Sequence, residues 1–250
     1  MCRMFLSIGK VKDICKLYES LVLASKEDIF MMKKNHSSGW GYFIASNERS
    51  YYYRSSKPIY EDEWNPYHYL QDEATYYAMF HSRLASPREP IRGFIDSHPF
   101  IVRGDERLII VAHNGSINKH LVAKELGISP ELYTDSEILA ILLSSYKTIN
   151  IKDRLEKAKE TIKRLGAFTG ALNVIAIEIS YNAAPHISVA CLSDFPLEKE
   201  GLYYKMVMYK GDNRYEFMSS TVAFYNKYID SEGNILDSHA SYCERGRVYP

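Results

Sequence analysis

Apolar side chains recur at helical spacing in some stretches of the chain and alternate with polar ones in others. Between Lys10 and Ser25 they return every three or four residues, which predicts an amphipathic helix close behind a short N-terminal strand. Gly39 to Tyr53 alternates loosely and is rich in aromatic residues, so a pair of strands is expected there, and Ala74 to Ser82 is expected to form another strand. Pro66 marks the stretch from Trp64 to Tyr69 as a loop.

The middle of the chain is predicted to be helical, and the final third is predicted to return to strands. Leu108 to Ala112 is a short apolar run rich in β-branched residues, and the turn dipeptide Asn114-Gly115 is expected to end it. Three helices are expected next, at Asn118 to Leu126, Asp135 to Tyr146 and Asp153 to Leu165. Four antiparallel strands are expected after them, at Leu172 to Ser180, His186 to Ser193, Leu202 to Tyr209 and Arg214 to Ser219.

No internal repeat, low-complexity tract or shift in composition divides the sequence. Residues 1–250 are therefore expected to form a single domain of the α+β class, with sheets covered by helices. The apolar fraction of 46% is large enough for a sizeable buried core.

Charge and cysteine usage exclude several classes of function. The 31 Lys and Arg residues balance 31 Asp and Glu residues, so no electrostatic footprint for nucleic acid or an anionic membrane is present. No apolar run approaches the ~18 residues that span a bilayer, and the first nine residues do not resemble a secretory signal. The four cysteines stand far apart without a CxxC pair, which argues against a zinc site or a disulfide scaffold. A cytoplasmic protein with a small-molecule or protein partner is expected.

Cys2 directly follows the initiator Met1, so removal of one residue would make it the N-terminus. A thiol and an α-amine would then share one residue, and an amine that titrates near ~7.7 to 8.0 can serve as the base for its own thiol. The alternative is a small residue at a frayed terminus, which position alone favours.

Two short motifs offer hydrogen-bond donors. Arg83 stands at the end of a predicted strand, where a guanidinium can hold a carboxylate through two parallel bonds and Ser86 can add a third donor. The alternative for Arg83 is a surface ion pair. Asn114 and Gly115 place a side-chain amide next to a backbone N–H, and such donors can form an oxyanion hole, although Asn-Gly is first of all a turn dipeptide.

Thr134 and Glu137 form the capping box that opens a helix, which leaves the carboxylate of Asp135 available for a ligand's ammonium group. An arginine for a carboxylate, an aspartate for an amine, donors for an oxyanion and a thiol together describe a site for an α-amino acid with a side-chain amide. Glutamine has that chemistry.

Six motifs also occur in the order seen in class II glutamine amidotransferases, and the chain most resembles the stand-alone members that begin with Met-Cys-Arg. The resemblance covers roughly the first 140 residues. The motifs are Met1-Cys2-Arg3, His36 to Gly41 with Gly39-Trp40-Gly41, His81-Ser82-Arg83, Ser97-His98-Pro99-Phe100, Ala112-His113-Asn114-Gly115 and Thr134-Asp135-Ser136-Glu137. The resemblance implies an N-terminal nucleophile hydrolase fold of four layers, αββα, with two stacked antiparallel sheets.

The resemblance also implies a role for each motif. Cys2 would be the nucleophile with its own α-amine as base, and Asn114 and Gly115 would form the oxyanion hole. Arg83, with help from Ser86, would bind the α-carboxylate of glutamine, and Asp135 its ammonium. Pocket support would come from Trp40, Gly41, His98 and His113. The reaction would release ammonia and then glutamate through a γ-glutamyl thioester, without a cofactor or a metal.

Three functions remain open at this stage, because relatives that make amino sugars, purines or asparagine carry a second domain that uses the ammonia. The chain would be a glutaminase that docks on a separate synthase subunit, a hydrolase of another γ-glutamyl amide, or a non-catalytic relative that binds or regulates.

Overall fold

The structure, a computed structural model, describes residues 2–63, 68–71, 74–86, 91–104, 106–147, 149–181, 186–196, 198 and 201–250. The loop predicted from Trp64 to Tyr69 lies mostly outside these residues. The strands are β1 (Arg3–Gly9), β2 (Trp40–Ala45), β3 (Ser50–Ser55), β4 (Tyr76–Ser82), β5 (Phe100–Gly104), β6 (Arg107–Ile117), β7 (Phe168–Ser180), β8 (His186–Ser193), β9 (Met206–Gly211), β10 (Arg214–Ser219), β11 (Ala240–Tyr242) and β12 (Arg247–Tyr249). The α-helices are α1 (Val11–Lys26), α2 (Lys119–Leu126), α3 (Asp135–Ser145), α4 (Ile151–Arg164) and α5 (Ser220–Tyr225). Short 3-10 helices are η1 (Ile29–Met31), η2 (Ile59–Glu61), η4 (Gly93–Asp96) and η6 (Leu202–Tyr204).

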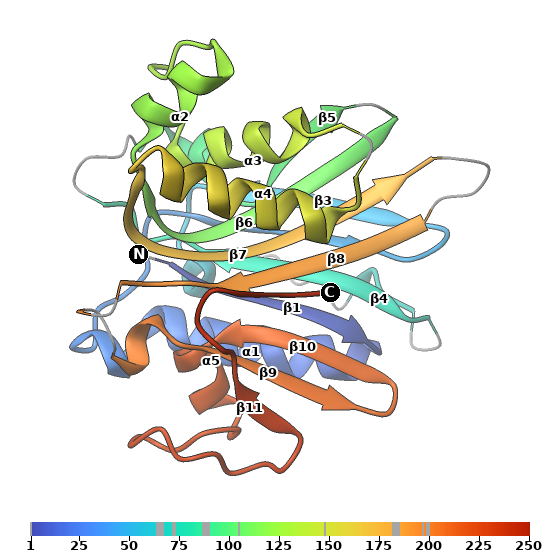
Figure 1. Ribbon diagram of the computed structural model, residues 1–250. Helices are drawn as coiled ribbons and strands as arrows, with labels where there is room; N and C mark the ends of the chain where they lie inside the picture. The colour runs from blue at the N-terminus through green and yellow to red at the C-terminus, as the bar shows by residue number, and fades with distance from the viewer. Residues whose placement is uncertain are drawn as a thin grey trace.

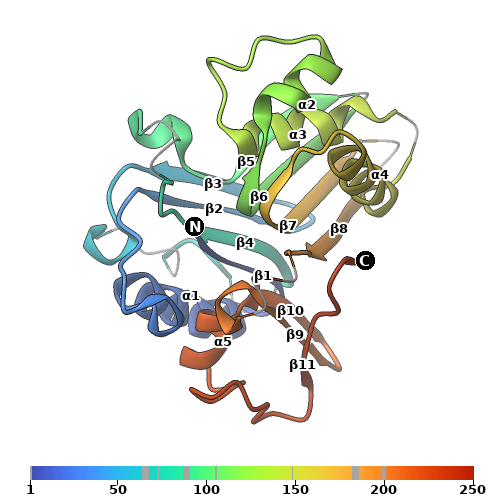
Figure 2. The same cartoon turned by 60° about the vertical axis from the view of Figure 1, so that its left-hand side comes forward.

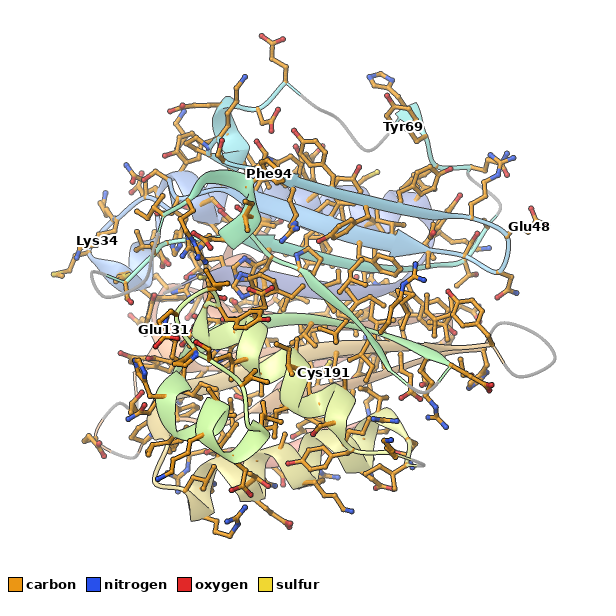
Figure 3. The ribbon with its side chains drawn as sticks, turned by 90° about the horizontal axis from the view of Figure 1, so that it is seen from above. Lys34, Glu48, Tyr69, Phe94, Glu131 and Cys191 are labelled. Atoms are coloured by element: carbon orange, nitrogen blue, oxygen red, sulfur yellow. The ribbon has the colours of Figure 1, made fainter. Side chains whose placement is uncertain are left out.

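Two antiparallel sheets form the middle of the molecule. Within the described residues, one sheet has seven strands in the order β11-β9-β10-β1-β4-β2-β3, and the other has five in the order β12-β8-β7-β6-β5. The sheets lie face to face, with α2, α3 and α4 over the five-stranded sheet and α1 and α5 against the seven-stranded sheet (Figures 1 and 2). Seen from above, β2 and β3 extend beyond the helical layer, with Phe94 of η4 over that edge (Figure 3). The predicted four-layer αββα architecture is confirmed.

Successive side chains of each strand point to opposite faces of its sheet, and this alternation divides the apolar side chains among three cores. Met4 and Leu6 of β1 pack between the sheets, whereas Phe5 points to the helices on the other side. Likewise Ile110 of β6 faces the opposite sheet and Ile109 faces the helices. Because both faces of these strands are buried, they read in the sequence as nearly continuous apolar runs. In the part of the chain that is described, no helix combines the length and apolar character needed to cross a bilayer.

The predicted end of a strand at Asn114-Gly115 is wrong. Strand β6 continues to Ile117, with Asn114 paired to Asn173 and Gly115 to Leu172 on β7, and the register shifts only beyond Gly115. A Cβ atom at Gly115 would lie 1.7 Å from the carbonyl oxygen of Ala171, so this glycine permits a close approach of two strands instead of a turn. A neighbouring strand that supplies backbone partners overrides the local turn preference.

The other predicted helices and strands are confirmed with small shifts at their ends, except that Leu202 to Tyr209 does not begin as a strand. Leu202–Tyr204 forms η6, and β9 starts at Met206. Strands β5, β11 and β12 and helix α5 were not predicted; β11 and β12 have three residues each, which is too short for a periodic signal.

A fully buried arginine anchors the start of β1. Nε of Arg3 donates to Oδ2 of Asp28 at 2.5 Å, and the guanidinium lies 4.0 Å from the ring centroid of Tyr203. The hydroxyl of Thr221 donates to Asp28 at 2.6 Å, and Nε2 of His36 lies 2.9 Å from the same carboxylate. Burial alone would raise the pKa of Asp28, but the Arg3 charge and these hydrogen bonds outweigh burial and hold that pKa well below its usual range. The pair therefore joins β1 to the segment after α1 and to α5.

Substitution of Asp28→Asn is expected to lower the free energy of unfolding by about 3 to 5 kcal/mol, because it leaves the Arg3 charge buried without its counter-ion. The control is Glu244→Gln, which removes an ion pair with Arg247 whose side chains are 69% and 57% exposed, and is expected to change stability by less than about 1 kcal/mol. Urea unfolding of both variants measures the difference, and equal effects would contradict the assigned role of Asp28.

Candidate active site

A small cavity of about 70 Å³ opens where the start of β1, the end of β4, strand β6 and the first turn of α3 meet. It brings together Cys2, Arg83, Gly115 and Asp135, which are far apart in the sequence. A larger hollow of about 360 Å³ lies along the hairpin of β5 and β6, and its described lining contains no cysteine, serine or threonine. The lining of the small cavity is Cys2, Arg83, Leu84, Ala85, Ser86, His98, His113, Gly115, Ser116, Thr134, Asp135 and Ser136.

Cys2 is buried at the inner end of this cavity. Its backbone N–H donates to Oδ1 of Asn114 at 2.9 Å, and its thiol lies 3.9 Å from the carbonyl oxygen of Leu84. Met1 lies outside the described residues. The contact to Asn114 exists because β1 and β6 belong to different sheets that stack on one another, so residues 112 positions apart face each other.

The side chain of Asn114 is oriented by that hydrogen bond. Because Oδ1 accepts from the Cys2 N–H, the Nδ2 group on the other side of the amide carbon remains the donor. Gly115 follows it in β6 and lines the cavity. An amide N–H of this kind beside a nucleophile can stabilise an oxyanion.

Arg83 directly follows β4 and is only 4% exposed. Its backbone N–H donates to the carbonyl of Gly39 at 2.8 Å, and its carbonyl accepts from the N–H of Ser38 at 3.0 Å. The hydroxyl of Ser38 also accepts from the N–H of Ala85 at 3.1 Å. The segment that carries Arg83 and Ser86 is therefore held against the chain before β2. Pro87, which follows Ser86, lies outside the described residues.

Asp135 begins α3 with Thr134 as its N-cap, whose hydroxyl accepts from the N–H of Glu137 at 3.1 Å. Oδ2 of Asp135 accepts from the N–H of Ile117 at 3.2 Å, and Oδ1 accepts from the hydroxyl of Ser136 at 3.2 Å. A carboxylate offers about four acceptor positions, so these two bonds fix its orientation and still leave capacity for an ammonium group.

Three buried histidines form one wall of the site: His98 and His113 line the cavity, and His81 stacks on His98. The rings of His81 and His98 stack with centroids 3.8 Å apart, and Nε2 of His81 donates to the carbonyl of His113 at 3.2 Å. Burial lowers the pKa of His81 and of His98 well below the usual value, and nearby ionisable groups that include Arg83 add to this effect. Burial also lowers the pKa of His113, although the charge of Asp135 opposes the shift. The wall is therefore uncharged at neutral pH.

Trp40 and Gly41 do not line the cavity. The indole of Trp40 packs in the core beneath α1, with its ring centroid 6.1 Å from that of Tyr18. A Cβ at Gly41 would lie 2.4 Å from the carbonyl oxygen of His98, so this glycine lets the segment of His98 approach β2 closely. Neither residue is in a position to contact the contents of the cavity.

Several residues around Cys2 were not predicted from the sequence. Arg3 and Tyr203 lie beside Cys2, and Ser136 links Asp135 to Nδ1 of His113, which is 2.9 Å from its hydroxyl. The sequence signal that could have found some of them is a polar residue within an apolar segment. Arg3 starts an apolar strand, and Asn173 interrupts the apolar run of β7.

Comparison with solved structures identifies long enzymes with a similar fold. The chain aligns over 99% of its length with 46% of the chain of the allosteric regulatory enzyme of purine biosynthesis, at 18% identity and a TM-score of 0.62. It aligns over 98% of its length with 49% of glutamine phosphoribosylpyrophosphate amidotransferase from B. subtilis, at 15% identity and a TM-score of 0.59. A predicted glutamine amidotransferase from Pseudomonas aeruginosa aligns with a TM-score of 0.44, at 11% identity, over 99% of this chain and 92% of that one.

The chain thus spans just under half the length of the first two of these structures. No family model matches it, and no curated protein matches it in sequence. Likeness at this identity establishes the fold alone: two stacked antiparallel sheets between helices, the N-terminal nucleophile hydrolase fold.

Acidification is expected to destabilise the protein through the histidine wall. The folded-state pKa of His98 is lowered, so its contribution to stability is complete above the unfolded pKa of about 6.5 and is lost as the pH falls below it. The loss is about 1 kcal/mol for each such histidine between pH 7 and pH 5.5.

His98→Phe keeps an aromatic ring beside His81 and Phe100 but cannot titrate. Its free energy of unfolding is therefore expected to fall by about 1 kcal/mol less than that of the wild type over the same pH range. His239→Gln, at a side chain that is 59% exposed, is the control and should follow the wild type. Denaturant unfolding at several pH values tests this, and parallel curves for His98→Phe and wild type would contradict it.

Proposed function

We propose that the chain is a glutamine amidotransferase domain that hydrolyses the side-chain amide of glutamine, with Cys2 as the nucleophile after removal of Met1. The observation that carries the proposal is the cavity that Cys2, Arg83, Gly115 and Asp135 line together, with Asn114 bonded to Cys2. These groups match the four parts of the substrate: amide carbon, carboxylate, developing oxyanion and ammonium. The proposal treats residues 1–250 as one such domain that acts in the cytoplasm without a cofactor.

In the first half of the reaction, the sulfur of Cys2 attacks the amide carbon while the thiol proton moves to the α-amine of the same residue. The carbonyl oxygen becomes an oxyanion, to which Nδ2 of Asn114 and the N–H of Gly115 donate. Collapse of this intermediate breaks the carbon–nitrogen bond, and the amine returns the proton to the departing ammonia. A γ-glutamyl thioester on Cys2 remains.

Water completes the second half of the reaction. The neutral amine accepts a proton from water as the oxygen attacks the thioester, and the same oxyanion donors act again. The carbon–sulfur bond then breaks, glutamate leaves, and the proton returns to the thiolate. The buried histidines take no part in these transfers and support the walls.

Recognition of glutamine over other amides rests on charge and size. Arg83 and Asp135 carry opposite charges at 4% and 6% exposure, which suits the zwitterionic end of an α-amino acid, and Ser86 can add a donor to the carboxylate. The small cavity favours the primary amide of glutamine over a bulkier γ-glutamyl amide. Released ammonia would pass to a separate synthase subunit.

Protein without Met1 is expected to release glutamate and ammonia from glutamine, and Cys2→Ala is expected to abolish the reaction because it removes the nucleophile. Mass analysis of the N-terminus on the same sample shows whether Met1 is absent. Protein that retains Met1 should be inactive, because its nitrogen is an amide and cannot act as a base. Activity that survives in Cys2→Ala would overturn the proposal, and folded mature protein without activity would favour a binding or regulatory role.

Arg83→Gln is expected to lower kcat/KM for glutamine by roughly 10- to 100-fold, mainly through KM, because it removes a charged donor worth about 1.5 to 3 kcal/mol. Arg103→Gln is the matched control, since Arg103 is exposed and lines a different hollow. Steady-state kinetics with glutamine measure both variants. An equal loss in the two would contradict the assignment of Arg83 to the carboxylate.

A further inference from the structure

A second asparagine, Asn173, lies beside the first at the inner end of the site. It pairs with Asn114 across β6 and β7, and paired residues of antiparallel strands place their side chains on the same face with Cβ atoms ~4.5 to 5.5 Å apart. That face is the one that meets β1, because Ile175 and Ile177 of β7 pack with Met4 and Leu6 between the sheets. Asn173 is fully buried.

A second set of contacts reaches Asn173 from the other side of Cys2. Nη1 of Arg3 lies 3.5 Å from the carbonyl oxygen of Cys2 and donates to the carbonyl of Tyr203 at 3.1 Å. Nδ2 of Asn173 donates to the next carbonyl, that of Tyr204, at 2.9 Å. Cys2, Asn114, Asn173 and η6 therefore form a closed ring of neighbours around the N-terminal end of β1.

The remaining polar atom of Asn173 has no partner. Among the described residues, no donor lies within hydrogen-bonding distance of its Oδ1, which is buried. A buried acceptor without a donor is destabilising, so its presence next to Cys2 calls for an explanation. Because Nδ2 donates to the carbonyl of Tyr204, Oδ1 lies on the other side of the amide carbon, away from that carbonyl.

We infer that Oδ1 of Asn173 accepts an N–H of the Cys2 α-amine once Met1 is gone. Before that step the nitrogen of Cys2 has one N–H, which goes to Asn114. A neutral amine has two N–H bonds and one lone pair, so two amide oxygens would bind both hydrogens and fix the lone pair toward the thiol and substrate. Asn173 is then a positioning residue for the base, an inference that rests on the proposed role of Cys2.

The test is the pH dependence of Cys2 in mature protein and in protein that keeps Met1 because methionine aminopeptidase is inhibited. The rate of alkylation of Cys2 by iodoacetamide is followed by mass spectrometry of the N-terminal peptide, since other cysteines are present. Glutamine hydrolysis is measured in parallel. The charged and ionisable groups around the amine stay the same in every variant: Arg3, Arg83, His98, His113, Asp135 and Tyr203.

In mature protein, Asn173→Ala is expected to lower kcat roughly 2- to 10-fold with little change in KM, as the loss of one hydrogen bond of about 0.5 to 1.5 kcal/mol predicts. Asn173→Asp keeps the acceptor and adds a charge that favours the ammonium form. Its alkylation profile and the acid limb of its kcat/KM profile should therefore move about one pH unit higher. With Met1 retained, no amine exists and the new carboxylate acts only on the thiol directly, so a clearly smaller shift in the alkylation profile is expected.

An unshifted profile for mature Asn173→Asp, or an equal shift in protein with Met1 retained, would overturn the inference and leave Asn173 a support for η6. The alkylation measurement needs no turnover. If mature wild type releases no glutamate yet its alkylation profile depends on Asn173, the proposed function fails and the inference about the amine stands.

Discussion

Face-to-face packing of the two sheets is the constraint on which the rest of the structure depends. Met4 and Leu6 of β1 fill the space against Ile110 and Ile175 of the opposite sheet, so the first strand cannot shift along its neighbours without uncovering that core. Cys2 lies two residues before Met4 and therefore on the same face of the strand, where its N–H meets the side chain of Asn114. The position of the proposed nucleophile thus follows from apolar packing several residues away.

Polar groups at the end of this core are tolerated because nearly all have a specific partner or are neutral. Arg3 is compensated by Asp28, and the stacked histidines give up their charge instead of binding a counter-ion. A charged histidine there would place a second positive charge beside Arg83. Burial therefore keeps the electrostatics of the cavity to two opposed charges, Arg83 and Asp135.

Sequence patterns predicted most of the fold through long periodic segments, and they identified most of the candidate site through short motifs. The helices α1 and α4 and the strands β7 and β8 have long periodic segments, whereas β11 and β12 exist only because long-range partners bind them. Arg83, Asp135 and Gly115 were found through short motifs with stated chemistry. Arg3, Tyr203 and Asn173 were missed, because buried polar contacts depend on which strands meet, and no local pattern records that. The same gap explains the misplaced strand end at Asn114-Gly115.

The hydrogen bond from Cys2 to Asn114 forms while the nitrogen is still a peptide amide. Under the proposed function, removal of Met1 would convert the amide nitrogen of Cys2 to an amine while its position beside Asn114 stays the same. The contact with Asn114 therefore exists before the amine does. Under the same proposal, exposure of the Cys2 amine would be a chemical change at an already assembled site, and the fold would be the same before and after it.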